Sequence, residues 1–211
     1  MRSGRPGTAL APEPLRTDAA SVLGRPLSDL ELDRLVKYVQ LLIKWQRSQR
    51  LVGSSDPNWI IDHIVVDSLL FARLLPSTSD RILDIGSGAG VPGIPLKIVN
   101  ERTSFTLLEA RAKRVSFLLA VVRELGLRHC EVVNARLENV ADQEGAASYD
   151  AAVVRCAGNP AELLAATVPA LKSGGLMIAA GPPRRRAISG GDWIEVERPR
   201  GKRLFWVARK A

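Results

Sequence analysis

Three glycines at alternate positions follow a short apolar run, and together they make residues 81–93 the stretch best suited to bind a small ligand. The run at 82–85 has the apolar side chains typical of a buried strand. Gly86, Gly88 and Gly90 have no Cβ atom, so a ligand can approach the backbone closely. The pattern predicts a strand that leads directly into a ligand-binding loop.

Two classes of ligand compete for this loop. Residues 88–93 match the GxGxxG pattern of dinucleotide-binding loops, and Glu109 follows about twenty residues later as a ribose partner. Residues 84–90 match instead the acid-x-Gly-x-Gly-x-Gly loop of S-adenosylmethionine-dependent methyltransferases, in which Glu109 would accept from both ribose hydroxyls. The second interpretation explains more of the spacing, because it also accounts for Asp84 and Gly86. A dehydrogenase would also need a second mononucleotide half or a hydride-handling site, and the sequence shows neither.

A tetrapeptide beyond the third expected strand is placed to hold an adenine. In this tetrapeptide, residues 135–138, a backbone amide and the carboxylate of Glu138 would bind the edge of the base while Leu137 packs on its face; the alternative is a surface turn. The backbone amides at the start of the helix after Gly90 add a partial positive potential, which suits the carboxylate of S-adenosylmethionine.

The elements that must position these residues alternate between apolar runs and helical stretches, as in a parallel sheet with helices on both faces. The expected strands are 82–85, 105–108, 131–134, 151–154 and 176–179. The expected helices are 92–99, 111–125 and 160–172. Two further runs, 193–196 and 204–208, lie too close together for a helical crossover, so they predict an antiparallel hairpin on the sheet edge.

A helical cap is expected over residues 28–76, ahead of an α/β domain at 77–211. A capping box at 28–31 begins its first helix, and Asp56 with Pro57 begins a second that runs to residue 75. Residues 1–27 are rich in Pro, Gly, Ala and Arg without a continuous apolar segment. They predict a flexible tail, neither signal peptide nor membrane span, and a cytoplasmic protein.

His63 and Asp67 are four residues apart on the second helix of this cap, so they share one face. The pair either forms a structural hydrogen bond or points toward a substrate cleft. Two cysteines, Cys130 and Cys156, lie far apart without a CxxC or His/Cys cluster, which predicts buried thiols and no metal site.

The net charge of +8 is concentrated toward the carboxyl end. From Gly181 onward nine Lys or Arg residues stand against three acids. Arg184, Arg185 and Arg186, followed by the basic stretch 198–203, would suit an RNA phosphate backbone. The alternative is a solvated basic tail.

The residues around the glycine loop resemble a known family. The resemblance rests on Ile-Leu-Asp-Ile-Gly-Ser-Gly-Ala-Gly-Val-Pro-Gly-Ile-Pro-Leu at 82–96, on Leu-Leu-Glu at 107–109 and on Lys113 with Arg114. Further matches lie at 44–45, 56–57, 63, 67–68, 117–118, 135–138 and 154–155. Residues 32–180 thus resemble the bacterial small-subunit ribosomal RNA guanine-N7 methyltransferases of the RsmG (GidB) type.

This resemblance implies a class I S-adenosylmethionine-dependent methyltransferase fold, Rossmann-like with a seven-stranded, mostly parallel sheet, and an N-terminal helical cap. It implies that S-adenosyl-L-methionine is the cofactor and that the target is N7 of one guanine in 16S rRNA of the small ribosomal subunit. The implied cofactor contacts are Gly86, Val91, Leu137, Glu138 and Arg155, and Lys113 and Arg114 would contact RNA.

The chemistry implied needs no general base, because guanine N7 presents a free lone pair and carries no proton. Arg155 and His63 remain the candidates for a further role at the reacting centre. Arg155 would bind a carboxylate or phosphate through its planar guanidinium, or else pair with Asp150 or Glu138.

Departures from the family pattern fall on the expected RNA side. No lysine follows the fifth strand at 179–183, and Arg-Leu-Val stands at 50–52 where the family has Asn-Leu-Thr.

The segment 159–162 lacks the Pro-Pro-aromatic box of exocyclic-amine enzymes, and Cys156 lacks the context of a nucleophile. Three functions remain open: an RNA methyltransferase, a non-catalytic RNA- or ribosome-binding module, and an NAD-dependent oxidoreductase. A monomer is expected.

Overall fold

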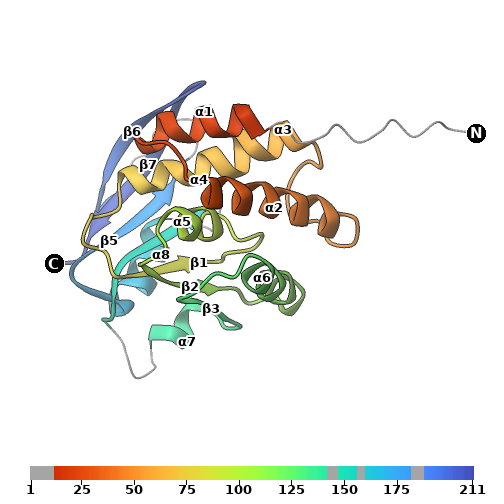
Figure 1. Ribbon diagram of the computed structural model, residues 1–211. Coiled ribbons are helices and arrows are strands. Elements are labelled where there is room, and N and C mark those ends of the chain that lie inside the picture. The colour runs from red at the N-terminus through yellow and green to blue at the C-terminus, as the bar shows by residue number, and fades with distance from the viewer. Residues whose placement is uncertain (1–11, 142–146, 156–159, 182–187) are drawn as a thin grey trace, which may run out of the picture.

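A seven-stranded sheet forms the centre of the computed structural model, which describes residues 12–141, 147–155, 160–181 and 188–211 (Figure 1). The strands are β1 (Arg81–Ile85), β2 (Ser104–Leu108), β3 (Cys130–Val133), β4 (Tyr149–Arg155), β5 (Leu171–Ala180), β6 (Asp192–Arg198) and β7 (Gly201–Arg209). Their order is β3-β2-β1-β4-β5-β7-β6. Pairings from β3 to β5 are parallel, whereas β7 runs antiparallel to β5 and β6. The predicted sheet and its edge hairpin are confirmed.

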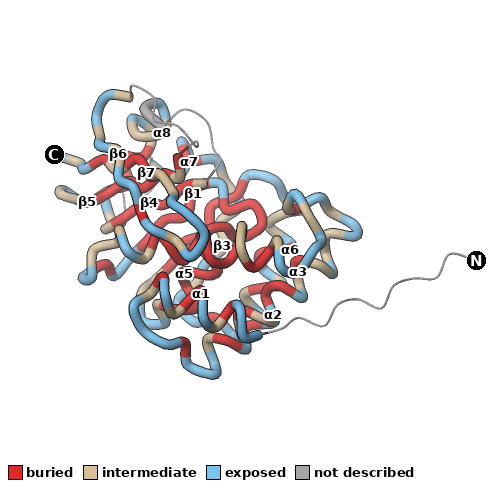
Figure 2. Tube along the Cα trace, turned by 90° about the horizontal axis from the view of Figure 1, so that it is seen from above, coloured by how far each residue is buried: buried red, intermediate tan, exposed pale blue. Residues whose placement is uncertain are grey.

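The central strands β1 and β4 are buried on both faces along most of their length, and their side chains are apolar on both sides. In β1, Ile82 faces one core cluster while Leu83 and Ile85 face the other. The first face packs against α5 (Gly93–Val99), α6 (Ala112–Glu124) and the N-terminal helices. The second packs against α7 (Leu137–Ala141) and α8 (Pro160–Thr167). Figure 2 shows the buried residues along the strands and the inner helix turns, with exposed residues on the outer turns.

The N-terminal helices begin where the sequence places their caps. Ser28 Oγ accepts from the Glu31 amide at 3.2 Å, and the Ser28 amide donates to Glu31 Oε2 at 2.8 Å. Asp56 Oδ1 accepts from the amide of Trp59 at 2.7 Å. The segments are α2 (Asp29–Gln46), α3 (Pro57–Ile60), a π-helix η1 (Ile61–Val66), α4 (Asp67–Leu69) and a 3-10 helix η2 (Leu70–Arg73). They share one apolar core with the sheet, so the cap and the α/β region fold as a unit.

Residues 12–23 correct the expected flexible tail, because they form helix α1 (Pro12–Leu23). Leu15, Ala19 and Val22 recur on one face and are buried against the other N-terminal helices. The prolines lie in the first turn, where a missing amide costs no helical hydrogen bond. Helix α1 lies across the β6–β7 hairpin and across the consecutive helical segments from Pro57 to Arg73, as Figure 1 shows. The prediction from composition overlooked this apolar stripe.

The helix expected over 160–172 ends earlier than the sequence pattern predicts. Helix α8 stops at Thr167, and a 3-10 turn η3 (Val168–Ala170) leads into β5 at Leu171. Pro169 has no amide to continue the helical ladder, which explains the early stop. No helix of the described ranges is long and apolar enough to cross a membrane.

Candidate functional site

The glycine loop leaves the carboxyl end of β1 in a conformation that side chains rarely adopt. Gly86, Gly88 and Gly90 have φ angles of 68°, 56° and 84°. The Ser87 amide donates to the carbonyl of Leu108 at 2.9 Å, which ties the loop to the end of β2. The loop therefore exposes backbone at the edge where parallel strands end, the usual ligand side of an α/β sheet.

Gly90 has a packing role that the sequence interpretation did not anticipate. A Cβ atom there would lie 2.4 Å from Ile94 Cγ1, and Gly90 lines neither of the two cavities described below. Gly93 is similar, since its Cβ would lie 2.5 Å from Asp84 Oδ2. Gly93 lets helix α5 pack closely against Asp84 of β1, and Gly90 lets the loop pack closely against Ile94 of α5. Gly86 and Gly88 instead face the ligand side.

Asp84 supports the loop from inside the core. Its side chain is fully buried, and Oδ2 accepts from the amide of Gly93 at 3.1 Å. Burial raises the pKa of this carboxyl to about 7, with the hydrogen bonds of Ser87 and Gly93 opposing the shift. Asp84 therefore anchors the start of helix α5 and does not reach a ligand.

Two cavities meet at Gly86 and Glu109. The larger, of about 510 Å³, lies between the glycine loop and the N-terminal helices and is lined by Gly86, Ser87, Gly88, Ala89, Val91, Glu109, Arg111, Arg114, Arg155, Leu51, Val52, Gly53, Trp59 and Ile64. The smaller, of about 230 Å³, lies at the ends of β2 and β3 and is lined by Ile85, Gly86, Leu108, Glu109, Ala110, Ala135, Arg136, Leu137 and Glu138. The two cavities together fit an elongated ligand with two different ends.

Glu109 is fixed at the junction of these cavities. Its Oε2 accepts from the amide of Gly88 at 2.9 Å and its Oε1 from the amide of Arg111 at 2.8 Å. Arg114 Nη1 lies 3.8 Å from Oε2. A carboxylate held in this way is oriented to accept further hydrogen bonds from ribose hydroxyls. The arrangement fits the adenosine half of S-adenosylmethionine, with Leu137 available to pack on the adenine.

Arg155, at the end of β4, lines the larger cavity but points its guanidinium at the helical cap. Its Nη2 donates to the carbonyl of His63 at 2.6 Å and lies 3.7 Å from Asp67 Oδ2. The expected alternative partner Asp150 pairs instead with Lys172, at 2.6 Å, so that alternative is wrong. Its Nη1 is buried and has no hydrogen-bond partner among the described residues.

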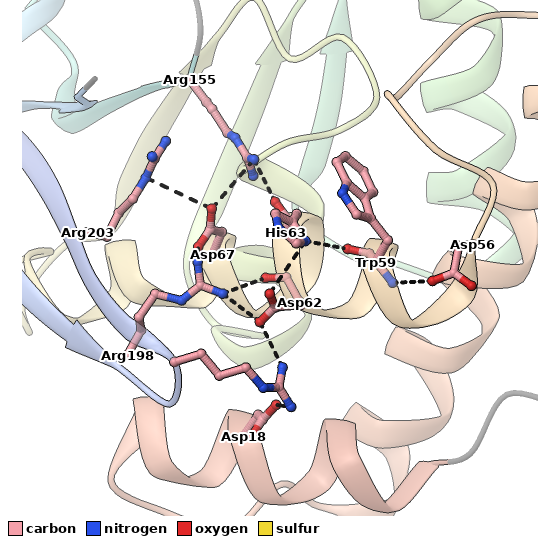
Figure 3. Close-up of polar contacts among 10 residues, drawn as sticks. Asp18, Asp56, Trp59, Asp62, His63, Asp67, Arg155, Arg198 and Arg203 are labelled. Carbon is pink, nitrogen blue, oxygen red and sulfur yellow. Dashed lines mark hydrogen bonds and ion pairs between the residues drawn. The ribbon is translucent and has the colours of Figure 1, made fainter. Parts of the chain in front are cut away.

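An ion-pair network joins this arginine to the hairpin (Figure 3). Asp67 Oδ1 lies 2.8 Å from Arg198 Nη1, and Asp62 pairs with both Arg198 and Arg200. Arg200 also lies 3.3 Å from Asp18 in α1. The arginines of the basic stretch 198–203 thus bind acids of the N-terminal helices, although the side chain of Arg200 stays 60% exposed.

His63 does not contact Asp67, which corrects the predicted hydrogen bond. His63 lies in the π-helical turn η1, and Asp67 follows at the start of α4. His63 instead stacks on Trp59, with ring centroids 4.8 Å apart and planes inclined by 8°. Its Nδ1 lies 3.2 Å from the Trp59 carbonyl and 3.5 Å from Asp62 Oδ2. Because both neighbours are acceptors, we assign the hydrogen to Nδ1.

Comparison with known proteins identifies the family. The model of rRNA small subunit methyltransferase G (GidB) matches residues 31–182, most of the chain. The chain belongs to this family. The ribosomal RNA small subunit methyltransferase G of Methylococcus capsulatus is 36% identical over 159 residues, 75% of either chain. Its counterpart in Neisseria meningitidis serogroup B is 37% identical over 169 residues, covering 79% of this chain and 78% of that relative.

A solved structure supports the fold assignment for this member of the methyltransferase G family. A methyltransferase from Geobacter sulfurreducens aligns with a TM-score of 0.56 at 16% identity, covering 88% of this chain and 91% of that chain. The class I methyltransferase fold predicted from the sequence is confirmed. Membership in the methyltransferase G family decides between the two ligand classes in favour of S-adenosylmethionine.

The cap supplies residues of the site that sequence reasoning missed. Leu51, Gly53 and Trp59 line the larger cavity opposite the glycine loop. The local signal was present, because Asp56 and Pro57 fix where the helix starts and hence where Trp59 projects. The sequence of this methyltransferase G family member did not show that the start of this helix lies beside β1 and β4.

Lys113 and Arg114 line a third cavity, of about 420 Å³, beside the larger one. Arg50 and Arg111 contribute to the same walls, so four cations surround this groove.

The predicted Arg184, Arg185 and Arg186 lie outside the described residues, as does Cys156. The described ranges contain no group of three or more His, Cys, Asp or Glu residues suited to a metal ion. Burial raises the pKa of the Cys130 thiol to about 12.

Proposed function

We propose that this protein transfers the methyl group of S-adenosyl-L-methionine to N7 of a guanine in the small-subunit ribosomal RNA. The observation that carries the proposal is the pair of cavities that meet at Glu109 and Gly86 on the carboxyl edge of the sheet. Family membership supports the same reaction and the same class of RNA.

Each end of the site suits one part of the cofactor. Glu109 would accept from the ribose hydroxyls, and Leu137 and Glu138 would hold the adenine in the smaller cavity. Gly86, Gly88 and Val91 would border the methionine end, and Arg155, which lines the same cavity, would bind its carboxylate or an RNA phosphate. When bound, the cofactor supplies an electrophilic methyl group on a sulfonium. The protein then has to align N7 with that methyl group, and no proton has to be removed.

The RNA side of the proposal rests on positive charge beside the larger cavity. Arg50, Arg111, Lys113 and Arg114 would contact phosphates next to the target nucleotide. We extend this interface to the basic segment 184–186, and we expect a cytoplasmic monomer acting on 16S rRNA within the small ribosomal subunit. Alanine at all three positions 184–186 should weaken RNA binding and reduce its salt dependence.

The decisive experiment is transfer of labelled methyl to small ribosomal subunits that lack the modification, followed by mapping of the modified base. Label at N7 of a single guanine is the expected result. Glu109→Gln should raise the dissociation constant for S-adenosylhomocysteine at least tenfold, because it removes the charge that ribose hydroxyls contact. Glu131→Gln, at an exposed carboxylate of β3, is the matched control and should bind normally.

Two outcomes would redirect the proposal. Saturable NAD binding without binding of S-adenosylhomocysteine would contradict the cofactor assignment. Tight binding of S-adenosylhomocysteine without methyl transfer to any small-subunit RNA would favour a non-catalytic RNA- or ribosome-binding module.

A further inference from the structure

Trp59 and His63 form a stacked aromatic pair in the helical cap, and we propose that this pair is the platform on which the target guanine stacks. The inference rests on the proposed function and adds a substrate-binding element to it. Trp59 lines the larger cavity opposite the glycine loop. Both side chains are partly exposed, and 46% of the His63 side chain is accessible. Part of each ring is therefore accessible, and Trp59 presents its accessible part to the cavity.

The pair is held rigidly from three directions. Asp56 caps the helix through the Trp59 amide at 2.7 Å, and His63 Nδ1 contacts the Trp59 carbonyl at 3.2 Å (Figure 3). A Cβ atom on Gly53 would lie 3.4 Å from Trp59 Cη2, so the loop that precedes the helix contacts the edge of the indole. Arg155 fixes the next turn through the His63 carbonyl. A fixed aromatic surface loses little entropy when a base stacks on it.

The position of the pair matches the side from which a methyl acceptor must approach. The smaller cavity lies over the ends of β2 and β3, so the adenosine half of the cofactor occupies that side. The strand order changes direction between β1 and β4, and the larger cavity opens there beside Arg155. The wall left for the acceptor is the cap wall. Trp59 is the aromatic residue on that wall among the described residues that line the cavity.

Guanine chemistry explains why an indole is suited to this place. Single-stranded bases are commonly recognised by stacking on aromatic side chains. During transfer the N7 lone pair forms the new N–C bond and the electrons of the breaking S–C bond return to sulfur. The positive charge passes to the purine, and no proton moves. An indole face attracts a cation, so the stack strengthens as the charge develops and favours the transition state over the ground state.

The test compares Trp59→Leu and Trp59→Phe with Trp45→Leu as the matched control. Trp45 is a partly buried tryptophan of the same cap that packs edge-on against Phe117 and lines neither cavity. Trp59→Leu should lower kcat/KM for unmodified small subunits roughly 5- to 150-fold, the range expected for lost base–aromatic stacking. Trp59→Phe should retain most of the activity, and the affinity of both variants for S-adenosylhomocysteine should stay within about twofold of wild type.

A second readout does not depend on transfer. With S-adenosylhomocysteine bound, 7-methylguanosine 5′-monophosphate should quench tryptophan fluorescence more strongly than guanosine 5′-monophosphate does. The quenching should disappear in Trp59→Leu and persist in Trp45→Leu. Absence of quenching in wild type, or equal quenching in Trp59→Leu, overturns the platform.

The outcomes separate the two proposals. If wild type transfers no methyl group yet shows Trp59-dependent quenching, the proposed reaction fails and the base platform stands. If wild type is active and Trp59→Leu matches it, the platform fails and the reaction stands. If Trp59→Leu loses affinity for S-adenosylhomocysteine as much as it loses activity, Trp59 belongs to the cofactor site and the platform is refuted.

Discussion

Arg155 Nη2 donates to the carbonyl oxygen of His63 across 2.6 Å, and this bond ties the end of β4 to the helix that carries Trp59. The same guanidinium faces Asp67, which is held in turn by Arg198 of the hairpin. The cap wall of the cavity is therefore positioned by the sheet and by the hairpin together.

Asp67→Asn should destabilise the protein strongly. The Asp67 side chain is 7% exposed and faces Arg155, Arg198 and Arg203. Arg198 keeps Asp62 as a partner, but the substitution leaves the buried guanidinium of Arg155 without this counter-charge. We expect a decrease of about 3–5 kcal/mol in the free energy of unfolding, measured by urea denaturation.

Glu124→Gln is the control for Asp67→Asn. Glu124 forms an ion pair with Lys37 at 3.3 Å, but its side chain is 45% exposed, so the change should stay within about 1 kcal/mol. Similar effects for Asp67→Asn and Glu124→Gln would show that the network contributes little to stability.

Asp84 predicts a loss of stability with rising pH. Burial raises the pKa of this carboxyl to about 7, so the folded protein holds a proton that the unfolded chain releases above its ordinary pKa near 4. Its contribution is complete below about pH 4 and is lost as the pH rises to about 7, by up to about 1.4 kcal/mol per pH unit. Urea denaturation between these pH values should show a flatter profile for Asp84→Asn, and parallel profiles would contradict the assignment.

Gly90→Ala should be more damaging than Gly126→Ala. Both glycines have positive φ angles, 84° and 59°, so alanine is strained at either position. Only at Gly90 does the new methyl group also meet Ile94, at 2.4 Å, whereas at Gly126 it enters open space. Thermal unfolding should show an additional cost of about 1–3 kcal/mol at Gly90. Equal costs would mean that Ile94 moves aside freely.

Leu15→Ala tests whether α1 is part of the core. Leu15 is fully buried, so the truncation should cost about 2–5 kcal/mol in unfolding free energy. The matched control is Leu30→Ala, at a leucine that is 53% exposed, which should change stability by no more than about 0.5 kcal/mol. If both leucines proved equally tolerant, α1 would be dispensable for the fold.

Lys113→Ala should reduce the salt dependence of RNA binding. Lys113 lies at the start of α6 beside the cationic groove, so its loss should lower the slope of log K against log salt by about 1. Arg123→Ala, at the far end of the same helix, should leave the slope unchanged. Filter binding with small-subunit RNA over a salt series measures both slopes.

Local patterns were sufficient for much of the fold. The strand at 82–85 and the loop that follows it were predicted correctly, because a buried strand favours apolar residues and a positive φ angle favours glycine. The capping box at Ser28 and the N-cap at Asp56 were predicted for the same reason, since each depends on residues within one turn. The edge hairpin followed from the short spacing between its two runs.

Features that depend on distant partners were not predictable in this way. The pairing of Asp67 with Arg198 joins residues that are adjacent only after the hairpin returns to the cap. The stacking of His63 on Trp59, which takes the place of the predicted contact with Asp67, has no marker that periodicity alone would detect. Helix α1 was missed because proline and arginine content outweighed a short apolar stripe.

Arg200 bonds to Asp62, 138 residues earlier in the chain, and also reaches Asp18. The acids of the cap therefore lack their partners until synthesis has passed the hairpin and its arginines have left the ribosome. Contacts of such wide separation in sequence cannot form during synthesis until both segments have been made. The wall that carries Trp59 therefore gains its full set of ion pairs only after Arg198, Arg200 and Arg203 have been made. The order of translation thus delays completion of the pocket until almost the whole sheet is in place.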